Sequence, residues 1–185
     1  FASRSHGYDT TDYHRLDPRL GDDADFDLLV AEARKRGLRI LLDGVFNHVG
    51  EDFARYRDGD SSWFRQRGND FEMFEGHDGL VALNHDNPDV VDYVVDVMTH
   101  WLGRGVDGWR LDAAYAVSPR FWRTVLPRVR DRFPDAWFLG EVIHGDYAGI
   151  VKASTFDSVT QYELWKAVWS SLNDGNFHEL DWALV

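Results

Sequence analysis

Three carboxylates in this chain each stand at the end of a short apolar run. Asp43, Asp112 and Glu141 follow stretches that consist mostly of Leu, Ile, Val, Trp, Phe and Gly. Acidic residues are poor strand formers and are costly to bury. Their repeated position after strand-like runs therefore predicts one catalytic rim, built where the ends of neighbouring strands meet.

The residues around two of these carboxylates suggest different protonation states. Arg110 and Asp112 share one face of an extended strand, so the guanidinium is expected to lower the pKa of Asp112 and to keep it ionised, as a nucleophile requires. The alternative is a structural ion pair, which is more common for an isolated R-x-D pattern. Glu141 has apolar neighbours and no adjacent cation in the sequence, and desolvation favours the protonated form that a general acid needs. An ionised Asp beside a protonated Glu is the arrangement used in glycoside hydrolysis.

A second group of polar residues follows the first carboxylate closely. Asp43, Asn47 and His48 leave one strand end within six residues. They could bind a substrate, or they could form a network that anchors the loop. The pattern alone favours neither.

These residues have to be positioned by alternating strands and helices. The segment 49–82 lacks a sustained period and is charged, aromatic and rich in Gly, which indicates an excursion loop or a small inserted lobe. The run 38–46 is too apolar for a one-sided strand and suits a buried parallel strand. Periodicity and capping residues predict helices over 23–36, 88–103, 119–133, 146–153, 161–172 and 176–185, and strands over 38–46, 106–112, 136–141 and 155–160.

This alternation implies βαβ units and a parallel sheet. Either an open doubly wound sheet or a (β/α)₈ barrel would fit. The barrel is favoured because chemistry-bearing residues lie at several successive strand ends, and because the sequence has no G-x-G-x-x-G motif.

Composition excludes several classes of function. The 185 residues are 44% hydrophobic and carry a net charge of −12, which makes nucleic acid and anionic membranes poor partners. With no cysteine, disulfides, thiol catalysis and Cys-ligated metals are excluded. No apolar run approaches the roughly 20 residues that span a bilayer.

Several short motifs together resemble a known family. The segment Asp43–His48 fits D-x-x-x-N-H, Gly108–Ala113 fits G-x-R-x-D-A, and Gly140–Glu141 fits a strand end that carries Glu. His6–Asp9 fits an upstream G-Y-D signature, and Leu83–Asn84 fits a weaker motif of the inserted lobe. In this order and spacing, over nearly the whole chain, they resemble the α-amylase family of retaining α-glycosidases and transglycosylases, glycoside hydrolase family 13.

The resemblance implies a fold and a domain organisation. The expected fold is α/β, a partial (β/α)₈ TIM barrel from about the end of strand 2 to strand 6, with a short inserted lobe after strand 3. The expected division is a barrel part over 1–48, the lobe over 49–83, and a second barrel part over 84–185.

The resemblance also implies residue roles. Asp112 would be the nucleophile of a double displacement, Glu141 the general acid and then the general base, and Arg110 the group that keeps Asp112 ionised. Two further residues would contact the sugar at the cleavage point: Tyr8 by stacking and His48 by a hydrogen bond.

Three more residues complete the expected site. Asp43 and Asn47 would brace it, with Asn47 as a calcium ligand in some members. His6 matches a His-Gly-Tyr form found in many endo-acting amylases, although a surface-loop histidine is an equal alternative. No cofactor is expected to be required, and a calcium ion is the less favoured alternative.

The chain departs from the family pattern in two places. No His-Asp motif for a third catalytic carboxylate follows Glu141 at a later strand end, and the first and last two strands are missing. We therefore expect an internal piece of the barrel, inactive alone, whose partner is the remainder of its own barrel. Tyr115 and Ala116 replace a Lys-His pair common after the nucleophile, which argues against starch endo-hydrolysis and calcium binding.

The favoured function is hydrolysis of an α-glucan or maltooligosaccharide with retention of configuration. A transglycosylase of the same family and a non-catalytic relative kept for binding are the alternatives. A metal-dependent hydrolase using His6, His48 and His144 is disfavoured, because the sequence has no H-x-H or H-x-x-x-H pattern.

Overall fold

A computed structural model of the chain describes residues 1–184 and shows strands that alternate with helices. Short 3₁₀ turns, labelled η, interrupt the connections. The elements in chain order are β1 (Ala2–Ser3), β2 (Thr10–Asp12), α1 (Asp23–Lys35), β3 (Leu41–Gly44), β4 (His48–Gly50), α2 (Ala54–Arg57), η1 (Ser61–Trp63), β5 (Gln66–Arg67), β6 (Asp70–Phe71), η2 (Phe74–Gly76), β7 (Leu80–Ala82), α3 (Pro88–Gly103), β8 (Gly108–Leu111), η3 (Ala114–Ala116), α4 (Pro119–Arg130), β9 (Trp137–Gly140), α5 (Tyr147–Ser154), β10 (Ser158–Val159), α6 (Tyr162–Asp174) and α7 (His178–Ala183).

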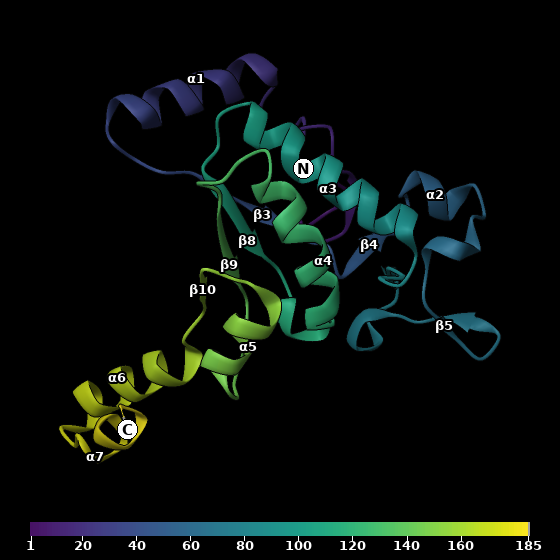
Figure 1. Cartoon of the computed structure of the whole chain (residues 1–185). Coiled ribbons are helices and arrows are strands. Elements are labelled where there is room, and N and C mark those ends of the chain that lie inside the picture. Colours follow the sequence, from purple (N-terminus) through teal and green to yellow (C-terminus); the bar gives the residue numbers. More distant parts are fainter. Residues whose placement is uncertain (185) are drawn as a thin grey trace.

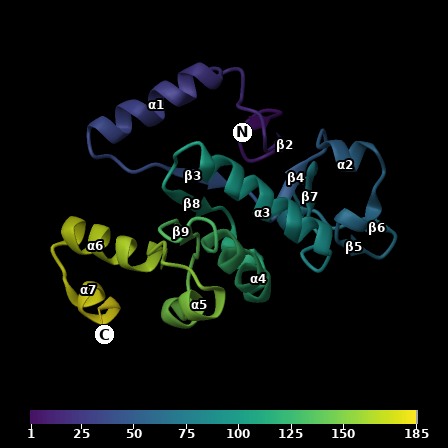
Figure 2. The same ribbon diagram turned by 45° about the horizontal axis from the view of Figure 1, so that its top comes forward.

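A four-stranded parallel sheet with the order β10-β9-β8-β3 forms the centre of the molecule. Helices α3 and α4 lie side by side along one face of it, with α5 beside α4 (Figures 1 and 2). Trp101 of α3, Trp109 of β8, Trp122 of α4 and Phe138 of β9 are fully buried and belong to one hydrophobic core. The chain is thus an α/β protein with the strand–helix alternation of a partial TIM barrel, as the sequence predicts.

The main helices begin where the sequence predicts, because their first residues supply the caps. Asp22 and Asp25 form a reciprocal capping box at the start of α1. Asn87 caps α3 and Ser118 caps α4, and each cap is followed by a proline, which tolerates the first turn. The helix expected over 176–185 is shorter, and residue 185 lies outside the described residues.

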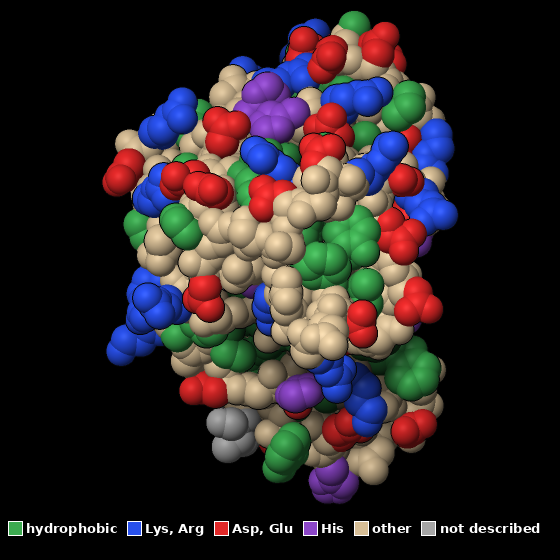
Figure 3. Space-filling model, turned by 90° about the vertical axis from the view of Figure 1, so that its right-hand side faces the viewer, with side chains coloured by type: hydrophobic (Ala, Val, Ile, Leu, Met, Phe, Trp, Pro, Cys, Tyr) green, Lys and Arg blue, Asp and Glu red, His purple; other side chains and the backbone are tan. Residues whose placement is uncertain are grey.

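Between β3 and α3 the chain leaves the sheet. There β4 pairs antiparallel with β7, and β5 forms a small hairpin with β6. Trp63 and Phe64 are buried, so these aromatic rings pack the excursion rather than face solvent. Figure 3 shows the side of the molecule where α2 and β5 lie, with acidic and basic side chains interspersed over its surface. The division of the chain at 48/49 and 83/84 stays a prediction.

Within the described residues, the run 38–46 is not buried on both faces as expected. Only Leu41–Gly44 forms strand β3, and Leu38 and Leu41 are 60% and 37% exposed. Among the described residues β3 pairs with β8 alone, so it is an edge strand with one open side. The last expected strand, 155–160, is likewise reduced to Ser158–Val159 at the opposite edge.

Beyond β10, helices α6 and α7 pack against each other and extend away from the sheet (Figure 1). They leave Trp165, Trp169, Leu172 and Trp182 exposed. In the part of the chain that the structure describes, no helix has the length and apolarity to cross a membrane.

Candidate active site

The carboxyl ends of β3, β8 and β9 bring the three carboxylates to one edge of the sheet. Gly44, Leu111 and Gly140 are paired across these strands. Backbone hydrogen bonds continue past the strands, since the Asp112 N–H donates to Gly44 O (2.9 Å) and the Glu141 N–H donates to Leu111 O (2.9 Å). The backbones of Asp112 and Glu141 are therefore each held by the neighbouring strand.

Arg110 connects all three acidic side chains. Its Nη1 lies 2.7 Å from Asp43 Oδ1 and 2.5 Å from Asp112 Oδ1, and its Nη2 lies 3.0 Å from Glu141 Oε2. The guanidinium of Arg110 thus lies between Asp112 and Glu141 and contacts both. The separation of these two carboxylates is therefore limited to the width of one guanidinium plus one polar contact on each side. The expected pairing of Arg110 with Asp112 is present in this cluster.

The premise that Glu141 has no neighbouring cation is wrong. Arg110 comes from the adjacent strand and reaches Glu141 through space, which sequence neighbours cannot reveal. The Ala113 N–H donates to Glu141 Oε2 at 2.8 Å, and the Tyr162 hydroxyl donates to Oε1 at 3.0 Å. Ala113 has φ 46, a left-handed conformation that a residue with a Cβ seldom adopts, directly after Asp112. Backbone strain of this kind is typical of functional sites.

The expectation that the pKa of Asp112 is lowered overall is also wrong. Asp112 is 8% exposed. Its burial raises the pKa to about 6, and the nearby charges of Glu141 and Asp43 act in the same direction against the lowering effect of Arg110. Asp112 is therefore ionised at neutral pH but takes up a proton in mildly acidic solution.

His48 and Tyr8 lie next to this cluster. His48 is buried, its Nε2 lies 3.1 Å from Tyr8 O, and burial lowers its pKa to about 4, so it is neutral at pH 7. Its ring stacks on Phe74 of η2, with centroids 4.5 Å apart. The Tyr8 hydroxyl donates to Asp43 Oδ2 at 3.4 Å, while Tyr8 remains 43% exposed. Asn47 is buried, with its Nδ2 3.1 Å from His48 Nδ1.

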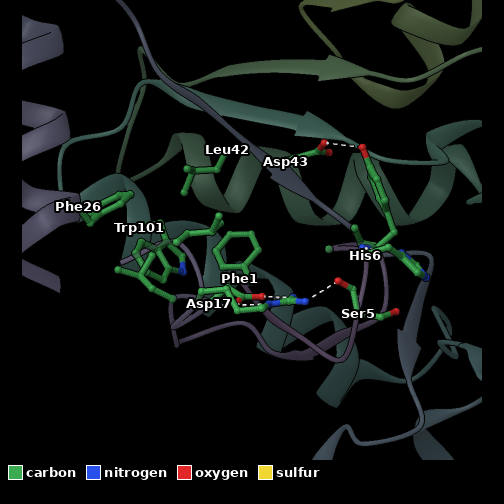
Figure 4. A pocket seen from close by; sticks show the side chains of 14 residues that line it. Phe1, Ser5, His6, Asp17, Phe26, Leu42, Asp43 and Trp101 are labelled. Carbon is green, nitrogen blue, oxygen red and sulfur yellow. Dashed lines mark hydrogen bonds and ion pairs between the residues drawn. The ribbon is translucent and has the colours of Figure 1, made fainter. Parts of the chain in front are cut away.

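His6 lies farther out, on an exposed loop. Its Nδ1 accepts a hydrogen bond from the Tyr8 N–H (3.2 Å), and its Nε2 is 3.8 Å from Asp9 Oδ2. With Tyr8 and Asp43 it borders a cavity of about 550 Å³. Figure 4 shows Asp43 and His6 on one side of this cavity and Phe26 and Trp101 on the other, where the lining is apolar. Arg110, Asp112 and Glu141 do not line it.

The comparison with known protein families agrees with this geometry. The family described as "Alpha amylase, catalytic domain" matches residues 1–71 and 57–181. The chain belongs to the alpha-amylase family. In the classification of glycosidases this is glycoside hydrolase family 13.

Curated members of the alpha-amylase family match most of this chain. Neopullulanase 2 of Thermoactinomyces vulgaris is 38% identical over 196 residues, which cover 96% of this chain and 33% of that protein. A cyclomaltodextrinase of Bacillus sp. is 37% identical, covering 90% of this chain and 33% of that protein. The chain therefore spans about a third of the length of these relatives.

Solved structures of the family share its fold. The cyclic alpha-maltosyl-(1→6)-maltose hydrolase of Arthrobacter globiformis, in its ligand-free form, superposes with a TM-score of 0.86 at 31% identity, covering 95% of this chain and 44% of that chain. A debranching enzyme of Nostoc punctiforme gives a TM-score of 0.80 at 33% identity, covering 89% and 38%. The sheet described above is accordingly part of an alpha-amylase-type catalytic barrel.

The alpha-amylase family resemblance raises the question of calcium at Asn47. Asn47 Oδ1 is buried and has no hydrogen-bond partner among the described residues. Calcium takes 6–8 oxygen ligands. Within residues 1–184, however, no group of three or more His, Asp or Glu side chains is arranged to hold a metal. Backbone and amide carbonyl oxygens can also serve as calcium ligands, so calcium binding at Asn47 stays a prediction.

Two contacts of the site were not predicted from the sequence. Tyr162 is the first residue of α6, and its hydroxyl reaches Glu141. Tyr115, noted above for its departure from the family pattern, donates to Glu75 Oε1 of η2 at 2.8 Å. Tyr162 follows the predicted strand 155–160 by two residues, which was the available signal, but it falls in the predicted helix 161–172 and resembles an ordinary helix residue.

Proposed function

We propose that the complete enzyme cleaves α-glucosidic bonds of α-glucans or maltooligosaccharides by double displacement with retention of configuration. The observation that carries this proposal is the single guanidinium of Arg110, which joins Asp112 and Glu141 at adjacent strand ends. Retaining glycosidases use two carboxyl groups about 5–5.5 Å apart. A pair of carboxylates held on one guanidinium suits that requirement.

In the first step Asp112 attacks the anomeric carbon while Glu141 donates its proton to the glycosidic oxygen. The C–O bond breaks, its electron pair passes to the leaving oxygen, and a covalent glycosyl-Asp112 ester forms. In the second step Glu141 removes a proton from water, the water attacks the anomeric carbon, and Asp112 leaves as a carboxylate. Arg110 stabilises the charge that returns to Asp112.

The surrounding residues suit a sugar. Tyr8 presents an exposed ring next to Asp43, and neutral His48 can hydrogen-bond a hydroxyl without introducing a charge. We assign stacking to Tyr8, hydrogen bonding to His48, and bracing to Asp43 and Asn47, with His6 at the outer edge.

The substrate class follows from the relatives. One of the Arthrobacter structures is a complex with cyclic alpha-maltosyl-(1→6)-maltose and another is a complex with maltose. By likeness we propose an α-glucan or a short maltooligosaccharide for this enzyme. The partner of residues 1–185 is then the rest of the same barrel, which would supply the third carboxylate. That these residues are inactive alone stays a prediction.

Product stereochemistry tests the reaction. With maltopentaose and the complete enzyme, ¹H NMR within the first minutes should show the α-anomer of the new reducing end, ahead of mutarotation. Initial formation of the β-anomer would exclude the double displacement. Longer maltooligosaccharides as the main early product would favour the transglycosylase alternative, and the absence of turnover on maltooligosaccharides, pullulan and cyclodextrins would favour a binding protein.

The pKa of Asp112 predicts the acid limb of the pH profile. Burial raises this pKa to about 6, and only the ionised carboxylate is nucleophilic, so kcat/KM should fall about tenfold per pH unit below about pH 6. The measurement is kcat/KM on a soluble maltooligosaccharide from pH 4 to pH 8, with stability checked at each pH. A limb centred near pH 4 would contradict the buried environment of Asp112.

A further inference from the structure

The two oxygens of the Glu141 carboxylate have different partners. Oε2 accepts hydrogen bonds from the Ala113 N–H (2.8 Å) and lies 3.0 Å from Arg110 Nη2. Oε1 accepts one from the Tyr162 hydroxyl (3.0 Å). The side chain of Glu141 is 14% exposed, so these contacts define most of its surroundings.

This difference decides which oxygen can hold a proton. A backbone N–H and a guanidinium only donate hydrogen bonds, so a proton on Oε2 would face two donors and no acceptor. A tyrosine hydroxyl can donate or accept. Protonation of Glu141 is therefore compatible with Oε1 and not with Oε2.

We propose that Tyr162 is a positioning residue for Glu141, which holds Oε1 in place and thereby confines the transferable proton to that oxygen. This inference rests on the proposed function of Glu141 as general acid. During bond cleavage the proton moves from Oε1 to the glycosidic oxygen, and the negative charge remains on Glu141. The Tyr162 hydroxyl keeps its own proton and donates a hydrogen bond to the carboxylate as its charge develops.

Thr160, at the end of β10, holds the backbone on both sides of Glu141. Thr160 Oγ1 accepts a hydrogen bond from the Val142 N–H (2.9 Å) and donates one to Val142 O (2.7 Å). The Thr160 N–H also donates to Gly140 O at 3.1 Å. Two residues later α6 begins with Tyr162, and Figure 1 shows α6 leading away from the end of β10. The backbone on both sides of Glu141 and its side chain are thus fixed from one strand end.

Charge supports a role in the transition state rather than in binding. Glu141 is approached by the cation of Arg110, by the carboxylate of Asp112, and by the hydroxyls of Tyr115 and Tyr162. A hydrogen bond to a charged acceptor is stronger than one to a neutral acceptor. The Tyr162 contact therefore strengthens as Glu141 loses its proton, which affects kcat rather than KM.

The test is Tyr162→Phe in the complete enzyme, which removes the hydroxyl and keeps the ring. On maltooligosaccharides we expect kcat to fall about 10- to 100-fold with KM changed less than about twofold. With an activated aryl maltoside, whose leaving group needs little protonation, the loss in the first step should stay below about threefold. Tyr56→Phe is the matched control, because that ring packs against Phe64 and Phe71 in the lobe, and it should leave both rates unchanged.

Three kinetic results would overturn the inference: equal losses on both substrates, a raised KM with unchanged kcat, which would make Tyr162 a sugar-binding residue, or no effect. A crystal structure of Tyr162→Phe provides a readout independent of turnover. The Glu141 carboxylate should lose its fixed orientation at Oε1, and an unmoved carboxylate would exclude the positioning role. Failure of the proposed function would appear separately, as turnover by an Asp112→Asn enzyme.

Discussion

Asp112→Asn is expected to lower kcat of the complete enzyme roughly 10⁴-fold or more on every glucoside tested. Loss of a nucleophile that forms a covalent intermediate removes the reaction path itself, and comparable knockouts in other enzymes have effects of this size or larger. The amide can still accept the Arg110 hydrogen bond, so the cluster should stay in place. The measurement is steady-state turnover of a maltooligosaccharide and of an activated aryl maltoside.

The same change should not weaken the fold at neutral pH. The pKa of Asp112 is about 6 in the folded state, above the usual value near 3.9. Protonated Asp112 therefore contributes fully to stability below about pH 3.9, and this contribution is lost as the pH rises through about 6. Asparagine removes this buried charge. We expect the free energy of unfolding at pH 8 to be unchanged or larger by about 1–3 kcal/mol, with little gain at low pH.

A matched control for this variant is Asp92→Asn on α3, whose side chain is 65% exposed and pairs with Arg128. It should change neither turnover nor stability noticeably. Activity of Asp112→Asn within tenfold of the wild type would show that Asp112 is not the nucleophile. Unfolding of the variant at pH 8 would show that its charge is needed to hold the cluster.

Glu141→Gln is expected to lower kcat about 10³-fold on maltooligosaccharides, because glutamine cannot donate an acidic proton to a poor leaving group. Activated aryl maltosides need little protonation, so formation of the glycosyl intermediate from them should be reduced much less. The second step still requires a base, so the intermediate should accumulate and produce a burst of aryl alcohol. Rapid-mixing kinetics measure the burst and the following slow phase separately.

An exposed glutamate provides the control for this variant. Glu32→Gln on α1 removes an ion pair with Lys35 and Arg36 at the surface and should leave both phases unaltered. Equal losses of the Glu141→Gln enzyme on both kinds of substrate would contradict the role of general acid. Rescue of the second step by added azide would support it, because an anionic nucleophile needs no base.

Much of the fold was predictable because its signals are local. Asp22 and Asn87 could be identified as helix starts from the sequence, since a cap acts within its own turn. Strand lengths were less predictable. The run 38–46 is apolar enough for a strand buried on both faces, but only Leu41–Gly44 pairs with a neighbour, and β3 lies at the edge of the described sheet.

In the site, too, features with local sequence signals were predictable, and contacts between distant segments were not. Asp112 and Glu141 could be selected by their place at strand ends, and Arg110 by its spacing from Asp112, because these properties depend on strand periodicity alone. Contacts across strands could not be read in this way. Arg110 also reaches Asp43 and Glu141, and Tyr162 approaches Glu141 from a segment 21 positions away.

By itself the sequence determined the kinds of chemical group available, their order along the chain, and the family whose barrel they fit. Tertiary structure decided the pKa of Asp112 and the hydrogen-bond partners of Glu141. The physical reason is that desolvation and through-space charge depend on what the neighbouring strands place around a side chain. Arg110, two positions before Asp112, predicted an acid made stronger by a cation, whereas the buried position of Asp112 near two other carboxylates makes it weaker.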